Sequence, residues 1–277
     1  MKVDSETSPS MHETAESQFS SYATPLVDDA ISRAAALNTD PDAEVLHKLR
    51  VALRRLRSLL WAYRPLLNRD FDDKQRAFFK YFASAAGKTR DWDILIELLN
   101  DTLHVKQAPT DSLRAARNDA LTSSRETLSD ASIKTALREA LKNANRELNT
   151  AHERTPLSKF ARKRLKSAEE SLHKRMRRAS HAKRSDYAAY HEVRKAGKKV
   201  RYLLEFFEPL LPKKQLKSAK ELKKIQKRFG ALNDVVASEE LLRGKRDIFP
   251  DDASLANALA ALDKERKRRV RAAAKLL

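Results

Sequence analysis

HKLRVALRRLRSLLWAYRPLL (residues 47–67) and HEVRKAGKKVRYLLEFFEPLL (residues 191–211) are two stretches of one 277-residue chain that align without a gap. Their histidines, three of their basic residues and the closing Pro-Leu-Leu coincide. Further on, GKTRDWDILIELL (residues 87–99) aligns with GALNDVVASEELL (residues 230–242) at an offset that is one residue shorter. Recurrence at a fixed distance is typical of a repeat architecture. We therefore expect the chain to hold two copies of one structural unit.

Each of the first two stretches has the apolar spacing of an amphipathic helix. When residues are placed at 100° intervals, the apolar side chains of each copy fall on one broad arc. The arc expected to face the core consists of Leu49, Ala52, Leu56, Leu59, Leu60 and Tyr63 in the first copy, and of Val193, Ala196, Val200, Leu203, Leu204 and Phe207 in the second. No segment shows the alternation of a β-strand, and four glycines are too few for a turn-rich β-sandwich. The sequence therefore predicts an all-α fold.

A line of cationic residues runs beside each apolar arc, with the spacing i, i+3, i+7, i+10. It consists of His47, Arg50, Arg54 and Arg57 in the first copy, and of His191, Arg194, Lys198 and Arg201 in the second. No acidic residue occurs between Glu44 and Asp70, so the first line lacks an internal counter-charge. Aligned cations repel one another, whereas arginine and lysine donate strong hydrogen bonds to phosphate oxygens. These eight residues, called the stripe residues below, are the candidate binding site for an external polyanion. The two helices that carry them are called the stripe helices.

The helix-breaking residues and the apolar spacing divide the chain into segments. In the first copy we expect helices over 22–37, 43–66, 71–86, 90–104 and 111–149, the last with a break. In the second copy we expect them over 156–179, 186–208, 213–229, 232–246 and 253–275. Residues 1–20 are predicted to be a disordered polar leader, 21–150 the first helical-bundle repeat and 151–277 the second. These lengths suit two four-helix bundles placed side by side.

The net charge of the chain lies entirely in its second half. The sequence has 57 Lys+Arg and 38 Asp+Glu, which gives a formal charge of +19, and residues 1–150 are balanced. Such asymmetry favours a surface that faces an anion, because self-repulsion otherwise opposes a compact state. The basic runs 173–184 and 264–271 are interpreted as solvated helix ends.

Several kinds of site are excluded or disfavoured. The chain has no cysteine, and each cationic line has one histidine among arginines, so neither a metal site nor another cofactor is expected. No phosphate-binding glycine loop and no recurring catalytic arrangement occurs, so we do not expect an enzyme. No apolar run is long enough for a membrane span, and a cytoplasmic location is expected. Asp91 and Asp234, which follow Gly87 and Gly230, are predicted to cap helix N-termini.

The duplicated H-x-x-R-x-x-x-[KR]-x-x-R helix, followed in each half by a glycine and then an aspartate, resembles the CHAD family, the conserved histidine α-helical domain. The resemblance covers about residues 22–277. It implies two four-helix bundles related by a pseudo-twofold axis, with a basic groove or pore between them. It also implies binding of inorganic polyphosphate by the eight stripe residues, in proteins that target or organise polyphosphate granules. Many relatives carry a triphosphate-tunnel domain with an E-x-E-x-K motif, which this sequence lacks, so a stand-alone binding module is expected.

Three other functions remain open from the sequence. The basic charge suits a nucleic-acid-binding protein, although few aromatic residues are available to stack on bases and weaker binding is expected. An enzyme that makes or hydrolyses polyphosphate would need carboxylates to hold a metal, and the stripes have none. An adaptor for an acidic protein is the third alternative.

Overall fold

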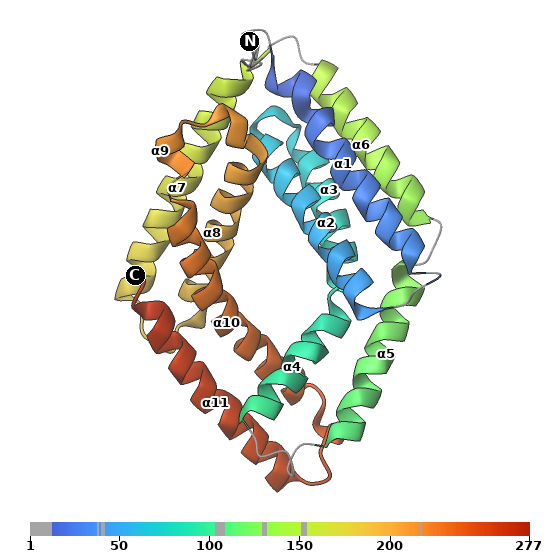
Figure 1. The fold of residues 1–277 in the computed structure, drawn as a ribbon, viewed down its shortest axis with the longest axis vertical. Helices are drawn as coiled ribbons and strands as arrows, with labels where there is room; N and C mark the ends of the chain where they lie inside the picture. Colours follow the sequence, from blue (N-terminus) through green and yellow to red (C-terminus); the bar gives the residue numbers. More distant parts are fainter. Residues whose placement is uncertain are drawn as a thin grey trace, which may run out of the picture.

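The computed structural model describes residues 13–37, 39, 42–102, 109–128, 132–150, 154–216 and 218–277 (Figure 1). The prediction of an all-α fold is confirmed, since the only β pairing among these residues is one isolated antiparallel bridge between Thr14 and Pro156. The first half forms α1 (Ala15–Ala36), α2 (Ala43–Tyr63), α3 (Arg69–Ala85), α4 (Lys88–Thr102), α5 (Thr110–Leu128) and α6 (Ser132–Thr150). The second half forms α7 (Leu157–His181), α8 (Tyr187–Phe207), α9 (Lys213–Leu216), α10 (Ala219–Arg243) and α11 (Asp252–Ala274). Short 3-10 turns follow α2 (Arg64–Leu66) and α8 (Glu208–Leu210) and precede α11 (Arg246–Ile248).

The first helix starts earlier than the sequence suggested. The expected leader reached residue 20, but α1 begins at Ala15, so that prediction is wrong for residues 15–20, while 1–12 lie outside the described residues. Thr14 caps the helix, because its side chain accepts a hydrogen bond from the Ser17 backbone N–H. Ala15 and Phe19 are buried, and the Ala15 N–H donates to the Thr155 carbonyl at 2.8 Å. Burial of apolar side chains thus extends the helix into a polar stretch.

The helix α10 is continuous where the sequence predicted a break. Two helices were expected, over 213–229 and 232–246, because Gly230 aligns with Gly87 at a helix boundary. Instead one helix runs from Ala219 to Arg243, preceded only by the short α9. Phe229, Leu232 and Val235 are buried on both sides of Gly230. Their burial outweighs the cost of a glycine inside a helix, about 1 kcal/mol.

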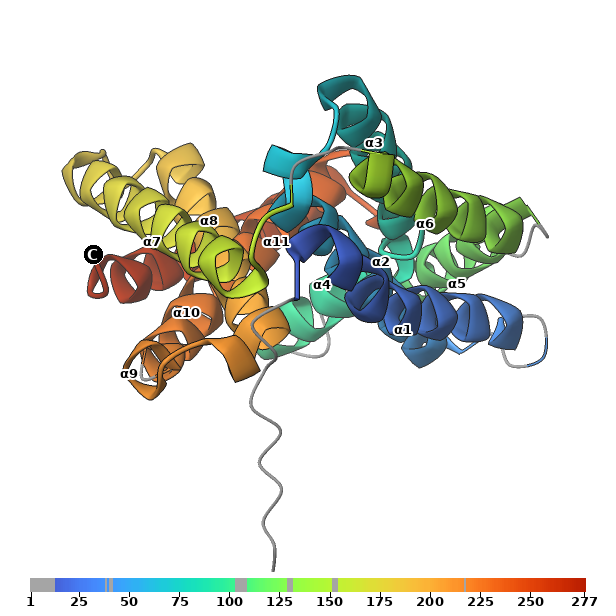
Figure 2. The same ribbon diagram turned by 90° about the horizontal axis from the view of Figure 1, so that it is seen from above.

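The two stripe helices pack through the faces that the sequence predicted. All six arc residues of α2 and all six of α8 are buried. α2 packs between α1 and α3, and α8 packs in the same order between α7 and α10. Figure 2 shows α1, α3, α5 and α6 gathered on one side and α7, α8, α9 and α10 on the other. Each stripe helix therefore directs its other face toward the middle of the molecule.

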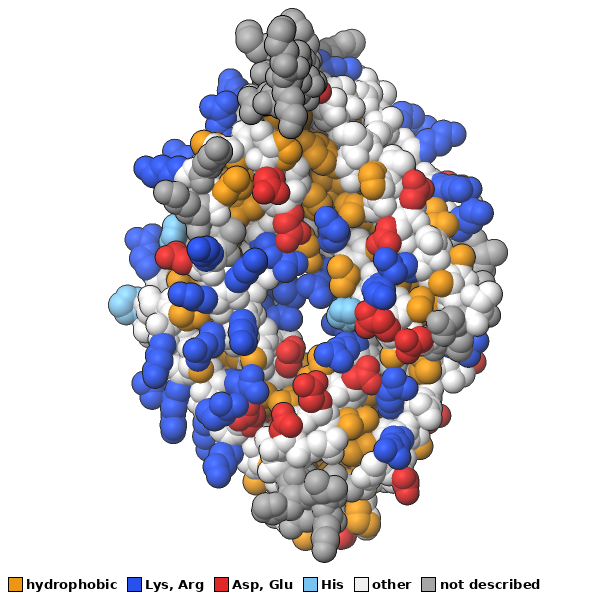
Figure 3. Space-filling view, viewed as in Figure 1, with side chains coloured by type: hydrophobic (Ala, Val, Ile, Leu, Met, Phe, Trp, Pro, Cys, Tyr) orange, Lys and Arg blue, Asp and Glu red, His pale blue; other side chains and the backbone are white. Residues whose placement is uncertain are grey.

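The hydrophobic cores do not divide at residue 150. One core joins α1, α2, α3 and α6 of the first half to α7, α8 and part of α10 of the second. The other joins α4 and α5 to the end of α10 and to α11, with Trp92, Leu95 and Leu99 packed among Val235, Leu242 and Leu262. The helices form a ring in which α2 and α8 stand on either side of a central opening, which remains in the space-filling view (Figures 1 and 3). The ring is thus closed by contacts between the two halves.

Candidate anion-binding cavity

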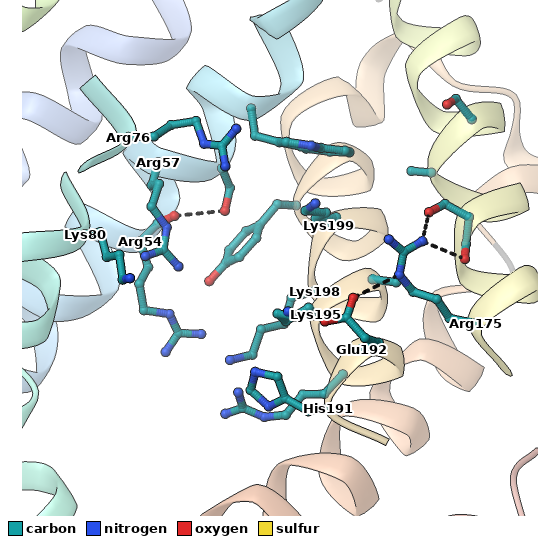
Figure 4. A pocket seen from close by; sticks show the side chains of 18 of the residues that line it. Arg54, Arg57, Arg76, Lys80, Arg175, His191, Glu192, Lys195, Lys198 and Lys199 are labelled. Atoms are coloured by element: carbon teal, nitrogen blue, oxygen red, sulfur yellow. Dashed lines mark hydrogen bonds and ion pairs between the residues drawn. The ribbon is translucent and has the colours of Figure 1, made fainter. Parts of the chain in front are cut away.

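A cavity of about 730 Å³ lies between α2, α3, α7 and α8. Its lining holds His191 and only two acidic residues, Asp73 and Glu192. The lining also includes nine arginine and lysine side chains: Arg54, Arg57, Arg76, Lys80, Arg175, Arg194, Lys195, Lys198 and Lys199. Figure 4 labels all of these side chains except Arg194 and shows them on the two sides of the cavity. Such a concentration of positive charge in a concave site attracts anions and concentrates them.

The structure brings five of the eight stripe residues to this cavity. Those in its wall are Arg54, Arg57, His191, Arg194 and Lys198. The other three, His47, Arg50 and Arg201, do not line it. The Arg201 Nε lies 3.1 Å from a Glu205 carboxylate oxygen, and its guanidinium lies over the Tyr202 ring.

Five further cations of the wall were missed by the sequence analysis. Arg76 and Lys80 come from α3, Arg175 from α7, and Lys195 and Lys199 from α8. Arg175 belongs to the run 173–184, whose interpretation as a solvated helix end is wrong at this residue. The spacing of i, i+4 between Arg76 and Lys80, and again between Lys195 and Lys199, was the available signal. It could not be read as part of a site because periodicity does not say which helices face one another.

Arg50 connects α2 to the start of α4. Its Nη1 donates to the Gly87 carbonyl at 3.0 Å and to the Asp91 carboxylate at 3.1 Å. A Cβ on Gly87 would lie only 2.4 Å from this Nη1, so the glycine makes room for the guanidinium. Asp91 therefore pairs with a stripe residue from the first turn of α4, where it lies inside the helix and not at its N-cap.

The matching aspartate of the second half lies elsewhere in its helix. Asp234 falls in the middle of α10, so the prediction that it caps a helix N-terminus is wrong. Burial raises the pKa of its carboxyl group, and Arg194 and Lys198 oppose that shift. In return, Asp234 partly offsets the lowering of the Arg194 pKa, whose main cause is burial. Asp234 therefore supports the cationic cavity wall from behind as a counter-charge.

Lys198 is the most perturbed cation of the wall. Burial, together with the guanidinium groups of Arg54, Arg194 and Arg50, lowers its pKa to about 6, against a smaller opposing effect of Asp234. Lys199 follows the same rule, since burial and nearby cations lower its pKa to about 8. Protonation of these amines is thus disfavoured while the cavity is free of anions.

The two stripe histidines lie in different surroundings. The Tyr187 hydroxyl donates to Asn233 Oδ1 at 2.9 Å and lies 3.1 Å from His191 Nδ1, so His191 belongs to a network between α8 and α10. His47 Nδ1 is buried without a hydrogen-bond partner among the described residues. The pKa of both imidazoles is lowered, mainly by burial and further by neighbouring Arg and Lys.

Trp61 lies at the edge of the same cavity and contacts two cations. The Arg164 guanidinium lies 4.5 Å from the centre of its ring and the Lys199 ammonium 4.6 Å. Arg164 also donates to the Trp61 and Ala62 carbonyls, which fixes it against α2. The indole is thus occupied as a cation–π acceptor and is poorly placed to stack on a base.

The described residues contain neither a metal-binding cluster nor a membrane-spanning helix. No group of three or more His, Asp or Glu side chains there could hold a metal ion. None of the described helices is both long and apolar enough to cross a membrane.

Known proteins resemble this chain in fold. A family model described as the CHAD domain matches residues 21–243. The crystal structure of the CHAD domain from the plant Ricinus communis is similar over 98% of this chain and 94% of that one, with a TM-score of 0.77 and 24% identity. PptA from Streptomyces chartreusis is similar over 95% of this chain and 98% of that one, with a TM-score of 0.64 and 18% identity. None of the curated proteins compared with the chain is a significant match.

Proposed function

The chain belongs to the CHAD family, and on this premise we propose that it binds inorganic polyphosphate in the cavity between α2, α3, α7 and α8, without catalysing a reaction. The observation that carries the proposal is the wall of nine arginines and lysines with only two acidic residues. One of those acids, Glu192, is already paired with Arg175 and Lys195. Arg76 is paired with Asp72 and Asp73. The other six cations of the wall have no ion-pair partner among the described residues and are left to neutralise a ligand of high charge density.

The chemistry of the wall favours phosphate over nucleotide bases. Arginine forks donate paired hydrogen bonds to phosphate oxygens, and lysines supply mobile point charges. Recognition of single-stranded nucleic acid depends on aromatic platforms, and Trp61, which lines the cavity, is covered by Arg164 and Lys199. We further propose that this binding places the protein on polyphosphate granules in the cytoplasm. Nucleic acid is the second candidate ligand, favoured by the net charge of +19 alone.

The test is a competition between ligands and between matched variants. Long-chain polyphosphate should displace labelled ligand at a lower charge concentration than duplex DNA or RNA at the same salt concentration. Arg54→Glu with Lys198→Glu should weaken polyphosphate binding about 100-fold or more, because two wall cations become anions. The control is Arg138→Glu with Lys142→Glu on α6, two exposed cations for which the described residues offer no ion-pair partner. Equal losses in both variants, or stronger binding of DNA, would overturn the proposal.

A further inference from the structure

Lys198 differs from the other three lysines of the cavity wall in what surrounds its amine. Lys80 is exposed, Lys195 is held in an ion pair, and the Lys199 ammonium lies over an indole ring. Lys198 is half-buried, and within the described part of the chain its amine has no hydrogen-bond or ion-pair partner. Its nitrogen is therefore both unoccupied and within reach of a molecule that enters the cavity.

The charges around Lys198 come from three helices. Arg54 and Arg50 act on it from α2 and Arg194 from α8, while Asp234 on α10 opposes them. With burial as the main cause, the pKa of Lys198 is lowered to about 6, so its amine is largely neutral at pH 8. An ordinary lysine, with a pKa of ~10.4, is neutral at that pH in only about one molecule in 250. Lys198 thus carries the free electron pair that a nucleophile needs.

The same cavity holds side chains that suit a phosphate group. Arg54 and Arg57 line it from α2 and Arg194 from α8, and Figure 4 shows Lys198 on the α8 side with Arg54 and Arg57 on the α2 side. Guanidinium groups donate paired hydrogen bonds to phosphate oxygens. The volume of about 730 Å³ is in the range of small-molecule sites. A small phosphorylated compound can therefore be held beside a neutral amine.

A compound that reacts there needs an electrophilic carbon next to its phosphate group. Acyl phosphates, the mixed anhydrides of a carboxylic acid and phosphoric acid, have a carbonyl carbon bonded directly to a phosphate oxygen. The phosphate is also the leaving group, and nearby guanidinium groups stabilise the negative charge that develops on it. Binding and reactivity thus favour the same class of compound.

We propose that Lys198 is a site of acylation by acyl phosphates that the cavity arginines recruit. The Lys198 nitrogen attacks the carbonyl carbon, an amide bond forms, and the bond from that carbon to the phosphate oxygen breaks. The phosphate leaves with the proton that the amine loses, so no further reactant is needed. The inference rests on the proposed function in one respect, the affinity of the wall for phosphate groups. Because an amide is not protonated, acylation removes one cation from the wall and should weaken polyphosphate binding.

The experiment treats the full chain with acetyl phosphate at pH 8 and follows each lysine by peptide mass spectrometry. Lys142, an exposed lysine of α6, is the internal control. Lys198 should be acetylated about tenfold faster than Lys142, since its larger neutral fraction and the bound phosphate group outweigh the weaker nucleophilicity of a less basic amine. With N-acetoxysuccinimide, which has no phosphate group, this preference should be at least about threefold smaller.

A matched pair of variants tests recruitment by the arginines. In Arg54→Gln, acetylation of Lys198 by acetyl phosphate should fall about fivefold, because one guanidinium partner of the phosphate is lost. Its acetylation by N-acetoxysuccinimide should change by less than about twofold, since pH 8 lies well above the Lys198 pKa of about 6. Arg138→Gln, on the exposed side of α6, should match the parent with both reagents.

The outcomes separate this inference from the proposed function. Acetylation of Lys198 no faster than that of Lys142, or slower than that of Lys199, would overturn the inference. An equal preference with both reagents would overturn recruitment by phosphate. Long-chain polyphosphate should slow acetylation of Lys198 and leave Lys142 unaffected, because it occupies the arginines and favours the ammonium form. Failure of the proposed function appears separately, as preferential acetylation of Lys198 that saturating amounts of long-chain polyphosphate do not slow.

Discussion

At the scale of single residues, Lys198 shows what burial does to a predicted binding cation. The sequence placed it in a line with His191, Arg194 and Arg201, and five of the eight stripe residues do line the cavity. The helical spacing was sufficient to predict that these residues share one side of their helix. The missing part was the depth of each side chain, because a helical wheel gives direction and not distance from solvent. Burial lowers the pKa of Lys198 to about 6, whereas its place in the sequence suggested an ordinary ammonium.

This pKa predicts that ligand binding takes up a proton. Between pH 6 and the ordinary lysine pKa of about 10.5, the free Lys198 amine is largely neutral, and a bound polyanion favours the ammonium. Affinity for polyphosphate should therefore rise as pH falls from about 8 to 7, by up to about tenfold for one proton. Lys198→Arg should flatten this dependence, because arginine stays protonated throughout. Titration calorimetry in buffers of different ionisation enthalpy measures the proton uptake directly.

The control is Lys199→Arg, because the Lys199 pKa of about 8 makes it a smaller contributor near pH 7. The stability of the free protein should change in the opposite sense. A lowered folded-state pKa means that the unfolded chain binds more protons in this pH range, so Lys198 favours folding increasingly as pH rises above about 6. An unchanged pH slope in Lys198→Arg would contradict the assignment.

At the scale of helices, Gly87 and Gly230 align in the sequence but stand in opposite situations. A Cβ on Gly87 would lie 2.4 Å from Arg50 Nη1, whereas a Cβ on Gly230 meets nothing within 4 Å. Gly87→Ala should destabilise the protein by about 1 kcal/mol, because the guanidinium must leave the Gly87 carbonyl and Asp91. Gly230→Ala should stabilise it by about 0.5–1 kcal/mol, since alanine is the better residue inside a helix.

Urea unfolding of both variants measures this difference, and each serves as the control for the other. Stabilisation by Gly87→Ala would show that the Arg50 contacts contribute nothing to folding. Destabilisation by Gly230→Ala would show that space beside α10 is tighter than the structure gives.

Some features of the helices could be predicted from the sequence and others could not. The apolar arcs of α2 and α8 were predicted in full, because periodic burial is strongly encoded over a long helix. The continuity of α10 was missed, because a glycine weakens a helix locally while buried neighbours such as Phe229 and Leu232 hold it together. The early start of α1 was missed for a related reason. Its stabilising contact with Thr155 comes from a segment about 140 residues away in the chain.

At the scale of the whole molecule, the site joins residues that no local pattern connects. Arg76 on α3 and Arg175 on α7 line the same cavity, and only the packing of the two halves places them there. The sequence predicted the sign of the charge and its enrichment in the second half. It predicted wall cations on α2 of the balanced first half, but not that α3 of the same half would add further ones, such as Lys80.

This distribution predicts a strong effect of ligand on thermal stability. The folded chain holds many like charges together, so a polyanion that binds only the folded state should raise the melting temperature. At a ligand concentration 100 times the Kd, the expected stabilisation is about 2.7 kcal/mol. Sodium chloride at an equal cation concentration should do less, because it screens charges without occupying the cavity. Differential scanning calorimetry with saturating polyphosphate checks this, and an unchanged melting temperature would contradict a site in the folded state.

The exchange of core residues between the halves has a consequence for how the ring holds together. An isolated fragment ending near residue 150 would leave Trp92, Leu95 and Leu99 without Val235 and Leu262 to cover them. The fragment that begins near residue 151 would lose the first-half side chains of both hydrophobic cores. Although the sequence reads as a tandem duplication, neither copy is an autonomous folding unit. The two copies should melt as one cooperative body, and separately made fragments should gain stable structure only on mixing, with the cavity assembled in the same event.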